Sequence, residues 1–246
     1  ESGTGRAIAA AAAANLTPVS LELGGKGASL IFADADLDVA VARSIDAIFT
    51  NAGQVCLAGS RLFVQREIYG EFLDRLVAAA EALVLGDPKD PATDVGPLAS
   101  EEHYKKVRSY IDDPEGRILT GGPGDDGWFV RPTVITDSPR DSRLWREEVF
   151  GPVLAVAPFD TEQDALRLAN DTAYGLNAMV FTENLARAHR MAGRLRAGTV
   201  WANCFFVRDL RLPFGGFGDS GIGREGGDFS REFFTEPKAV VVAVPG

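Results

Sequence analysis

The chain has 246 residues, of which 46% are hydrophobic and 24% are charged, so its composition is that of a folded globular protein. Its 25 basic and 35 acidic residues give a net charge of −10, which argues against binding to nucleic acid or to an anionic membrane surface. No apolar run approaches the ~20 residues of a membrane-spanning helix, so we expect no membrane span. Two cysteines do not make a disulfide scaffold and indicate a reducing, cytoplasmic setting.

The histidine count limits the possible chemistry. Only His103 and His189 are present, which argues against a histidine-built site, and we expect no metal. The same count makes a Ser-His-Asp hydrolase unattractive. If the protein uses a general base, we therefore expect that base to be a carboxylate.

Strand and helix patterns alternate along the whole chain, which predicts an α/β fold with a mostly parallel sheet flanked by helices. Residues 87–100, 114–127 and 213–228 are rich in glycine or proline and predict loops. Asp36, Ser100 and Thr161 are expected to cap the helices that follow them. We expect helices at 5–15, 37–48, 68–83, 100–111, 161–170 and 185–195, and strands at 19–23, 28–32, 61–65, 129–135, 153–159, 178–182, 199–203 and 239–244.

Two overlapping glycine patterns, Gly216-x-Gly218-x-x-Gly221 and Gly221-x-Gly223-x-x-Gly226, match the dinucleotide fingerprint in form. That motif works only between a strand and a helix, because the phosphate then lies at the helix N-terminus. Neither context is present here, so we predict a plain loop.

Glu22 lies at a strand end between two leucines and is followed by Gly24 and Gly25. Apolar neighbours raise the pKa of a carboxyl toward the range of a useful base. An ordinary ion pair between Glu22 and Lys26 is the alternative.

Cys56 follows a helix and ends the loop segment Asn51–Cys56. Backbone N–H groups of such a loop can stabilise both a thiolate and an oxyanion, which would make this cysteine reactive. A buried, inert cysteine is the alternative. For Cys204, which lies among large apolar residues, the inert interpretation is favoured.

The segment Glu147–Pro152 pairs two acids with an aromatic residue before a sharp turn. A carboxylate can accept two hydrogen bonds from a ribose diol, and an aromatic ring can lie against a nicotinamide. A solvated acidic turn is the alternative.

Taken together, these motifs resemble the NAD(P)-dependent aldehyde dehydrogenase superfamily, in the order and spacing of that family. The resemblance runs the length of the chain and rests on Glu22-Leu-Gly-Gly-Lys26, Gly53-Gln-Val-Cys56, Glu147-Glu-Val-Phe-Gly-Pro152, Pro213-Phe-Gly-Gly216 and Ser220-Gly-Ile-Gly-Arg-Glu225.

The resemblance implies a catalytic role for two residues. Cys56 would be the nucleophile that forms a thiohemiacetal and then a thioester, and Glu22 would activate the water that releases the acid. NAD would be the cofactor, with NADP not distinguished from it. Cofactor contacts are implied for Glu148 and Phe150 at the nicotinamide ribose and ring, for Leu23 and Gly24 near the carboxamide, and for Glu1 near the pyrophosphate.

Residues 203–216 look most like the branch that acts on 2-hydroxymuconic and 5-carboxymethyl-2-hydroxymuconic semialdehydes. An aldehyde substrate that carries a carboxylate is therefore expected. The resemblance gives Arg208 the role of binding that carboxylate, with Arg211 as second candidate and Asn203 in the same substrate site.

The resemblance also implies a domain organisation. Residues 1–24 would be a remnant of the Rossmann-like cofactor-binding domain, 25–216 the catalytic domain, 217–235 a return segment to the cofactor domain and 236–246 an oligomerisation strand. A homodimer or homotetramer is expected, because six apolar residues in an exposed strand would otherwise be an aggregation hazard.

The chain resembles only the C-terminal half of such an enzyme, and we expect it alone to bind NAD poorly. Three alternatives follow from that expectation or from the same residues: a weak thiol esterase that uses Cys56 and Glu22, a CoA-acylating relative, and an inactive fragment that retains oligomerisation. A carboxylate at Glu22 favours hydrolysis over acylation of CoA.

Overall fold

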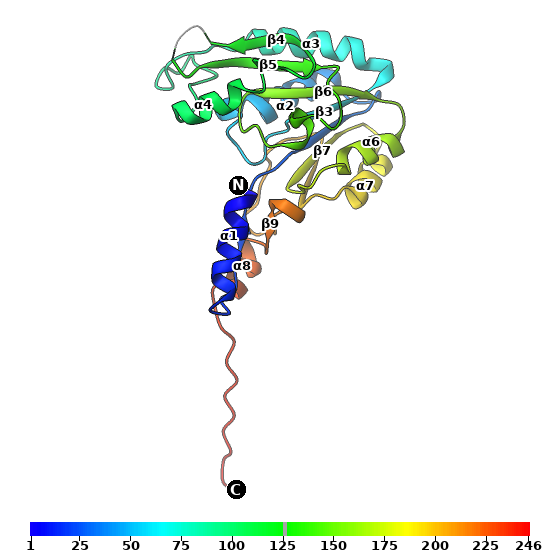
Figure 1. The fold of residues 1–246 in the computed structure, drawn as a ribbon. Coiled ribbons are helices and arrows are strands. Elements are labelled where there is room, and N and C mark those ends of the chain that lie inside the picture. The colour runs from blue at the N-terminus through cyan, green and yellow to red at the C-terminus, as the bar shows by residue number, and fades with distance from the viewer. Residues whose placement is uncertain (125–126) are drawn as a thin grey trace.

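A seven-stranded sheet forms the centre of the computed structural model, which describes residues 1–124 and 127–246 (Figure 1). Its strand order is β4-β5-β6-β3-β2-β7-β8, and all neighbours are parallel except β4 and β5. The α/β fold with a mostly parallel sheet is thus confirmed. The strands are β2 (Ala28–Ile31), β3 (Arg61–Gln65), β4 (Arg117–Pro123), β5 (Val130–Thr136), β6 (Val153–Phe159), β7 (Asn177–Phe181) and β8 (Thr199–Ala202).

Helices cover both faces of this sheet and divide the core into two clusters. On one face, α2 (Leu37–Phe49) and α3 (Tyr69–Glu81) bury side chains such as Ile48 and Phe72. On the other face, the core contains Val107, Trp145 and Leu166, which belong to α4 (Glu101–Arg108), α5 (Arg143–Arg146) and α6 (Glu162–Asn170); α7 (Leu185–Arg194) adds Met191. Strands buried on both faces explain the near-continuous apolar runs in the sequence.

The three predicted helix caps are confirmed by their hydrogen bonds. Asp36 Oδ1 accepts from the backbone N–H of Val39 at 3.1 Å, and Thr161 Oγ1 accepts from that of Asp164 at 3.1 Å. Ser100 Oγ accepts from the N–H of His103, also at 3.1 Å. The helix that starts at Ser100 reaches the cavity described below.

The prediction of a loop over 114–127 is wrong for most of that segment. Arg117–Pro123 forms β4, which pairs antiparallel with β5 at the edge of the sheet, with register shifts on either side of Thr120. Gly121 and Gly122 adopt φ near +100°, so the strand is bulged there. Glycines that read as loop signals therefore serve an irregular edge strand. Residues 125–126 of the predicted loop lie outside the described residues.

The two ends of the chain meet in an arm beside the main body (Figure 1). It contains α1 (Ser2–Ala13), η3 (Gly218–Ser220) and α8 (Gly227–Phe233), and the two-residue strands β1 (Leu21–Glu22) and β9 (Gly221–Ile222) pair antiparallel. The segment 213–228, predicted to be a plain loop, thus contains η3, β9 and the start of α8. Gly221 and Ile222 form part of a strand pair, which differs from the strand–turn–helix context that the dinucleotide motif requires.

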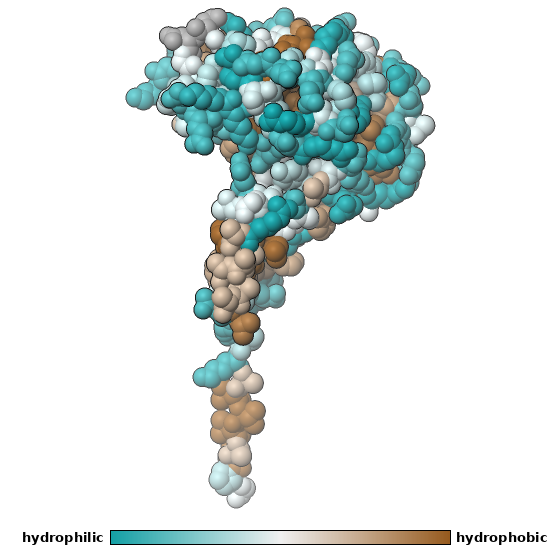
Figure 2. All heavy atoms as spheres, viewed as in Figure 1, coloured by the Kyte–Doolittle hydropathy of each residue, from teal (hydrophilic) through white to brown (hydrophobic). Residues whose placement is uncertain are grey.

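The strand predicted at 239–244 is not formed within this single chain. Residues 235–246 run as an extended tail away from the body, with apolar side chains along it (Figure 2). Val241 is 94% exposed, and no strand of the described residues pairs with the segment. A strand needs a partner for its backbone groups, so its pairing with another subunit stays a prediction.

Three loops meet at one edge of the sheet. Residues 23–27, 51–60 and 147–152 lead into β2, β3 and β6, which are parallel neighbours, so all three loops lie at the amino ends of their strands. These loops contain residues of three of the sequence motifs, those at 22–26, 53–56 and 147–152. Within the described part of the chain, none of the helices combines the length and apolar character that crossing a membrane requires.

Candidate active site

A cavity of about 300 Å³ lies where the three loops meet the arm and α4. It brings together both residues predicted to be catalytic and all five predicted to contact a cofactor. Two further residues, His103 and Lys106, were not singled out from the sequence. The cavity is lined by Glu1, Glu22, Leu23, Gly24, Cys56, His103, Lys106, Glu148 and Phe150.

The loops approach so closely that side chains are excluded at their contacts. A Cβ atom added to Gly25 would lie 2.4 Å from the Cys56 carbonyl oxygen, and one added to Gly53 would lie 2.2 Å from the Gly151 carbonyl oxygen. Gly53 also has φ of +70°. The glycines of the sequence motifs thus allow three backbones to touch around the cysteine.

Glu22 is held by the β1–β9 pair at the cavity wall. Both of its carboxylate oxygens are buried and have no hydrogen-bond partner among the described residues. Burial, with a smaller contribution from the charge of Glu225, raises the pKa of Glu22 to about 7. The alternative, an ordinary ion pair between Glu22 and Lys26, is not formed in the described residues.

Cys56 is half-buried and lies in a turn closed by the hydrogen bond from Ala58 N–H to the Val55 carbonyl at 3.0 Å. Burial raises the pKa of its thiol, and the negative charges of Glu148 and Glu22 act in the same direction. The backbone N–H groups of Cys56 and Leu57 oppose this shift without overcoming it. At rest the thiol is protonated, so it needs a base to become a nucleophile.

Cys204 is half-buried as well, and burial also raises the pKa of its thiol. It packs against the apolar cluster on the α2 face and does not line the cavity. The solvent exposure of the two thiols therefore does not distinguish Cys56 from Cys204. What separates them is the carboxylate that shares a cavity with Cys56.

Glu148 and Phe150 also line the cavity. Glu148 Oε1 accepts a hydrogen bond from Gly25 N–H at 2.8 Å, and burial raises the pKa of this carboxyl. Phe150 has a left-handed φ of +59°, which is rare for a bulky residue. Its carbonyl lies 2.6 Å from His103 Nε2, and the two rings meet edge to face.

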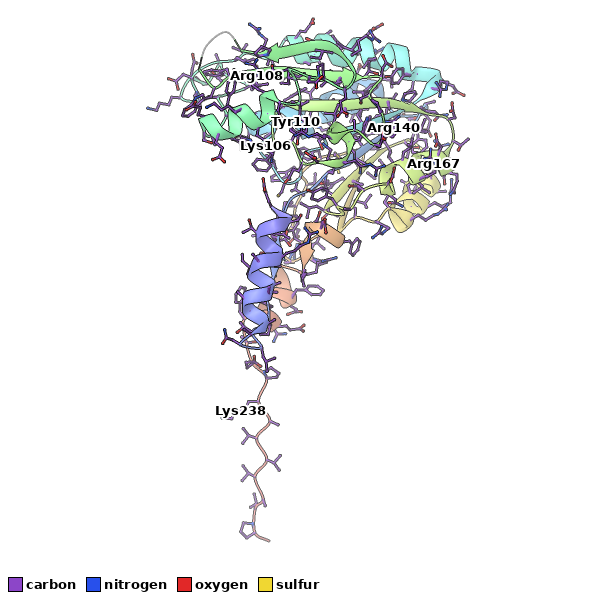
Figure 3. The ribbon with its side chains drawn as sticks, viewed as in Figure 1. Lys106, Arg108, Tyr110, Arg140, Arg167 and Lys238 are labelled. Atoms are coloured by element: carbon purple, nitrogen blue, oxygen red, sulfur yellow. The ribbon has the colours of Figure 1, made fainter. Side chains whose placement is uncertain are left out.

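The cavity residues on α4 lie three positions apart, on one face of the helix. Lys106 is directed toward the start of α1 (Figure 3), where its Nζ lies 3.1 Å from Glu1 Oε1. That ion pair lowers the pKa of Glu1. Sequence reasoning missed His103 and Lys106 because the one signal, the i, i+3 spacing, is common on any exposed helix.

The three predicted substrate residues lie outside this cavity. The Arg208 guanidinium lies 4.3 Å from the centre of the Phe214 ring and lines a neighbouring cavity of about 610 Å³. Its positive charge acts on Glu22 and lowers the pKa of that carboxyl slightly against the effect of burial. Arg208 is therefore on the Glu22 side of the molecule.

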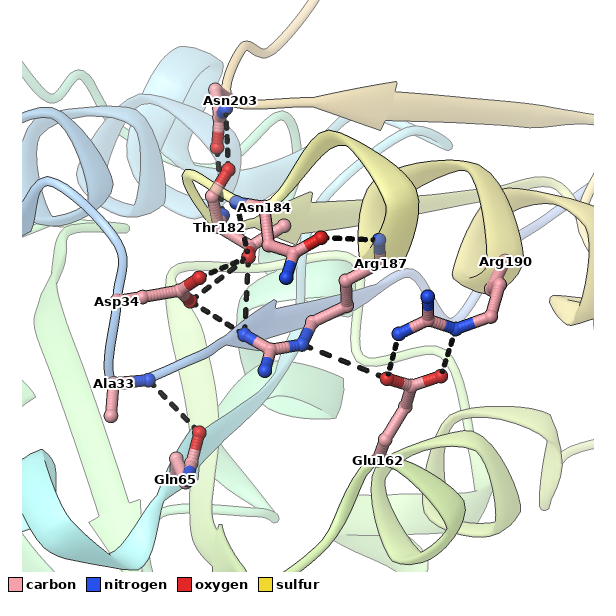
Figure 4. Close-up of polar contacts among 9 residues, drawn as sticks. All are labelled: Ala33, Asp34, Gln65, Glu162, Thr182, Asn184, Arg187, Arg190 and Asn203. Carbon is pink, nitrogen blue, oxygen red and sulfur yellow. Dashed lines mark hydrogen bonds and ion pairs between the residues drawn. The ribbon is translucent and has the colours of Figure 1, made fainter.

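Arg211 and Asn203 are engaged elsewhere. Arg211 has an 88% exposed side chain and forms a two-pronged ion pair with Asp209. Asn203 uses its whole amide on the backbone of Thr182, accepting from the N–H and donating to the carbonyl at 2.9 Å each (Figure 4). Of the two candidate arginines, Arg208 is therefore the one without an ion pair among the described residues.

Comparison with known proteins adds the family. The sequence model of the aldehyde dehydrogenase family matches residues 1–240. The chain is 49% identical to a 2-hydroxymuconic semialdehyde dehydrogenase of Pseudomonas sp. (strain CF600), covering 98% of this chain and 52% of that protein. It is 44% identical to the human 2-aminomuconic semialdehyde dehydrogenase, covering 97% of this chain and 52% of the relative.

A solved structure agrees with these relatives. The crystal structure of betaine aldehyde dehydrogenase from Staphylococcus aureus in complex with NAD+ matches with a TM-score of 0.91 at 42% identity. The match covers 94% of this chain and 48% of that one. The chain thus spans about half the length of the relatives that it matches.

We expect Glu22 to make folding stability depend on pH. Its pKa is about 7 in the folded protein and near 4.5 when unfolded, so the folded state binds more protons between these values. The contribution of Glu22 to the free energy of unfolding should therefore fall as the pH rises from about 4.5 to 7. Chemical denaturation across this range measures it. Glu22→Gln should reduce the decline, leaving the part that the raised pKa of Glu148 contributes, and the exposed control Glu67→Gln should keep it in full. The same decline in both variants would contradict the assignment.

Proposed function

Because the chain belongs to the aldehyde dehydrogenase family, we propose that its site oxidises an aldehyde to a carboxylic acid with NAD+, using Cys56 as nucleophile and Glu22 as base. The observation that carries the proposal is the single cavity shared by the thiol, the carboxylate and the five cofactor residues. The relatives are named as dehydrogenases of this kind, and the chain carries the matching motifs throughout.

The chemistry follows from the two raised pKa values. Glu22, with a pKa of about 7, takes the proton of the Cys56 thiol, and the thiolate adds to the aldehyde carbon. The backbone N–H of Cys56 would stabilise the developing oxyanion, as the family resemblance implies. Oxidation leaves a thioester on Cys56. Glu22, once it has released the thiol proton to solvent, removes a proton from the water that hydrolyses the thioester. Such a thiol must stay reduced, which favours the cytoplasm as its compartment.

The cavity residues fit the nicotinamide end of a dinucleotide. Glu148 is a half-buried carboxylate with one hydrogen bond from Gly25, and its second oxygen is available for a ribose hydroxyl. Gly24 leaves open a space that a Cβ would fill, 2.1 Å from that oxygen. Phe150 supplies a ring face, while Leu23 and Gly24 supply backbone polar groups. NAD+, when bound, accepts the hydride; the protein residues hold and orient it.

For the substrate we propose a muconic-type semialdehyde that carries a carboxylate. Arg208 supports this assignment, because its guanidinium lies over Phe214 close enough to Glu22 to affect that carboxyl. A guanidinium binds a carboxylate with two parallel hydrogen bonds and stays charged at all relevant pH values. A general aldehyde oxidiser has little use for such a cation there.

We further propose a homo-oligomer in which the tail of one copy pairs with β8 of its partner. Strand β8 ends the sheet and has a free outer edge in the described residues, with the cavity of about 610 Å³ beside it. The tail offers the apolar residues Val240–Val244, extended and exposed. An unpaired edge and an unpaired apolar strand complement one another in backbone hydrogen bonds and in apolar surface.

Cys56 should react before Cys204 when limiting iodoacetamide is added to the folded protein. The reason is the neighbouring base, since both thiols are half-buried. Peptide mapping by mass spectrometry gives the order of labelling. Preferential labelling of Cys204 in the unchanged protein would refute the nucleophile assignment.

Arg208→Ala should raise KM for 2-hydroxymuconic semialdehyde about tenfold to several hundredfold, the loss expected for a hydrogen bond between charged groups. Turnover of an uncharged aliphatic aldehyde should hardly change. The assay uses this chain fused behind the first half of the Pseudomonas relative, with NADH production as readout. Arg211→Ala is the matched control, since that side chain is paired with Asp209. Equal losses on both substrates would assign Arg208 to the fold.

Removal of residues 236–246 should convert the proposed oligomer into monomers at micromolar concentration. Sedimentation velocity compares the truncated and complete chains. A charged substitution of one exposed tail residue, Val241→Lys, should weaken association without shortening the chain. A complete chain that sediments as a monomer would contradict the pairing.

A further inference from the structure

Asn177, the first residue of β7, lies directly behind the turn that carries Cys56. It is only 5% exposed, and its Nδ2 donates a hydrogen bond to the Leu57 carbonyl at 3.0 Å. Since a carbonyl can only accept, the amide orientation is fixed with nitrogen toward Leu57. The bond joins residues 120 positions apart in the chain, so it is a tertiary contact that restrains this turn.

Leu57 connects this contact to the thiol. Its backbone N–H acts on the Cys56 sulfur and favours the thiolate, against the effect of burial. Its carbonyl, on the other side of the same Cα, is the group that Asn177 holds. Fixing the carbonyl restrains the backbone of Leu57 and keeps its N–H directed at the sulfur.

The other end of the Asn177 amide is also confined. Asn177 Oδ1 and Lys26 Nζ are both buried and unpartnered among the described residues, and both residues line a cavity of about 10 Å³, the space that one water needs. A Cβ added to Gly27 would lie 2.9 Å from Asn177 Nδ2 and 2.6 Å from the Ala58 carbonyl oxygen. The amide is therefore wedged between the residue 24–27 loop and the cysteine turn.

We propose that Asn177 is a positioning residue for the nucleophile, which holds the Leu57 carbonyl so that the Leu57 N–H stabilises the Cys56 thiolate. Asn177 acts through Leu57 and lines the cavity behind the turn, so it does not touch aldehyde or cofactor. This inference rests on the proposed role of Cys56.

Two variants of the complete 246-residue chain test the hydrogen-bond donor of Asn177, its Nδ2 group. Asn177→Ala removes the side chain, and Asn177→Asp keeps its shape but replaces the donor with an acceptor. The carboxylate adds charge and the alanine adds space, so a loss common to both reflects the missing donor. Asn170→Ala is the matched control, because Asn170 lines the same small cavity and donates to the Arg194 carbonyl at 3.0 Å, away from the turn.

The readout is the rate at which iodoacetamide modifies Cys56 as a function of pH. Both Asn177 variants should slow the modification about fivefold to tenfold at pH 8 and shift the profile to higher pH, as loss of one hydrogen bond to the thiolate predicts. Cys204 should react at its original rate in every variant. A role in folding alone would lower the unfolding temperature without shifting the Cys56 profile.

Two results overturn the proposal, and they are distinguishable. If Cys56 of both variants keeps the original pH profile, Asn177 does not position the thiol, while the role of Cys56 stands. If Cys56 of the unchanged protein reacts no faster than Cys204, the proposed function itself fails and the inference falls with it. If Asn170→Ala shifts the pH profile of Cys56 modification as much as the Asn177 variants do, a specific role of the hydrogen bond between Asn177 and Leu57 is also refuted.

Discussion

Close contact between backbones, at positions where a side chain cannot fit, is the constraint on which the site depends. Gly25 lies against the carbonyl of Cys56, and Gly53 lies against that of Gly151. These contacts join loops that are separated along the chain but precede parallel neighbouring strands. The sheet brings the loops to one edge, and the glycines let them close around the thiol. A single Cβ at either position would force the loops apart around the cavity that Cys56 and Glu22 line.

The same closeness sets the acid–base properties of the site. Burial raises the pKa of Glu22, Glu148 and Cys56, and the negative charges of the two carboxylates raise the pKa of the thiol further. The resting site thus keeps its proton on sulfur and has a carboxyl with a pKa of about 7 nearby. A carboxyl with a pKa near neutral pH is suited to accept a proton at that pH, as the role proposed for Glu22 requires.

Sequence patterns predicted most of the sheet, because its strands are short apolar runs and its helices carry local caps such as Asp36 and Thr161. The predicted catalytic and cofactor residues line one cavity, whereas the predicted substrate residues Arg208, Arg211 and Asn203 lie outside it. Strand β4 was missed because Gly121 and Gly122 look like a loop while they serve a bulge. His103 and Asn177 could not be found from the sequence, since their importance depends on contacts with Phe150 and Leu57, which are far away in the chain.

The polar side chains at the two ends of the strands differ in how fully they are paired by hydrogen bonds. Beyond the carboxyl ends of β2 and β7, Asp34, Thr182 and Arg187 bind one another, and Glu162 ties Arg190 to the same network (Figure 4). Ligands of open α/β sheets usually bind at that edge. Here it is closed by its own side chains.

At the amino ends of the strands, three residues around Cys56 keep buried polar atoms without partners among the described residues, namely Glu22, Lys26 and Asn177. The network beyond the carboxyl ends is more fully paired, although Arg187 Nε there also has no hydrogen bond. An unpartnered buried polar atom destabilises a fold unless water or a ligand meets it. Glu22, which lines the cavity with Cys56, is therefore a group whose oxygens would gain stability from a partner entering that cavity, as its proposed role requires.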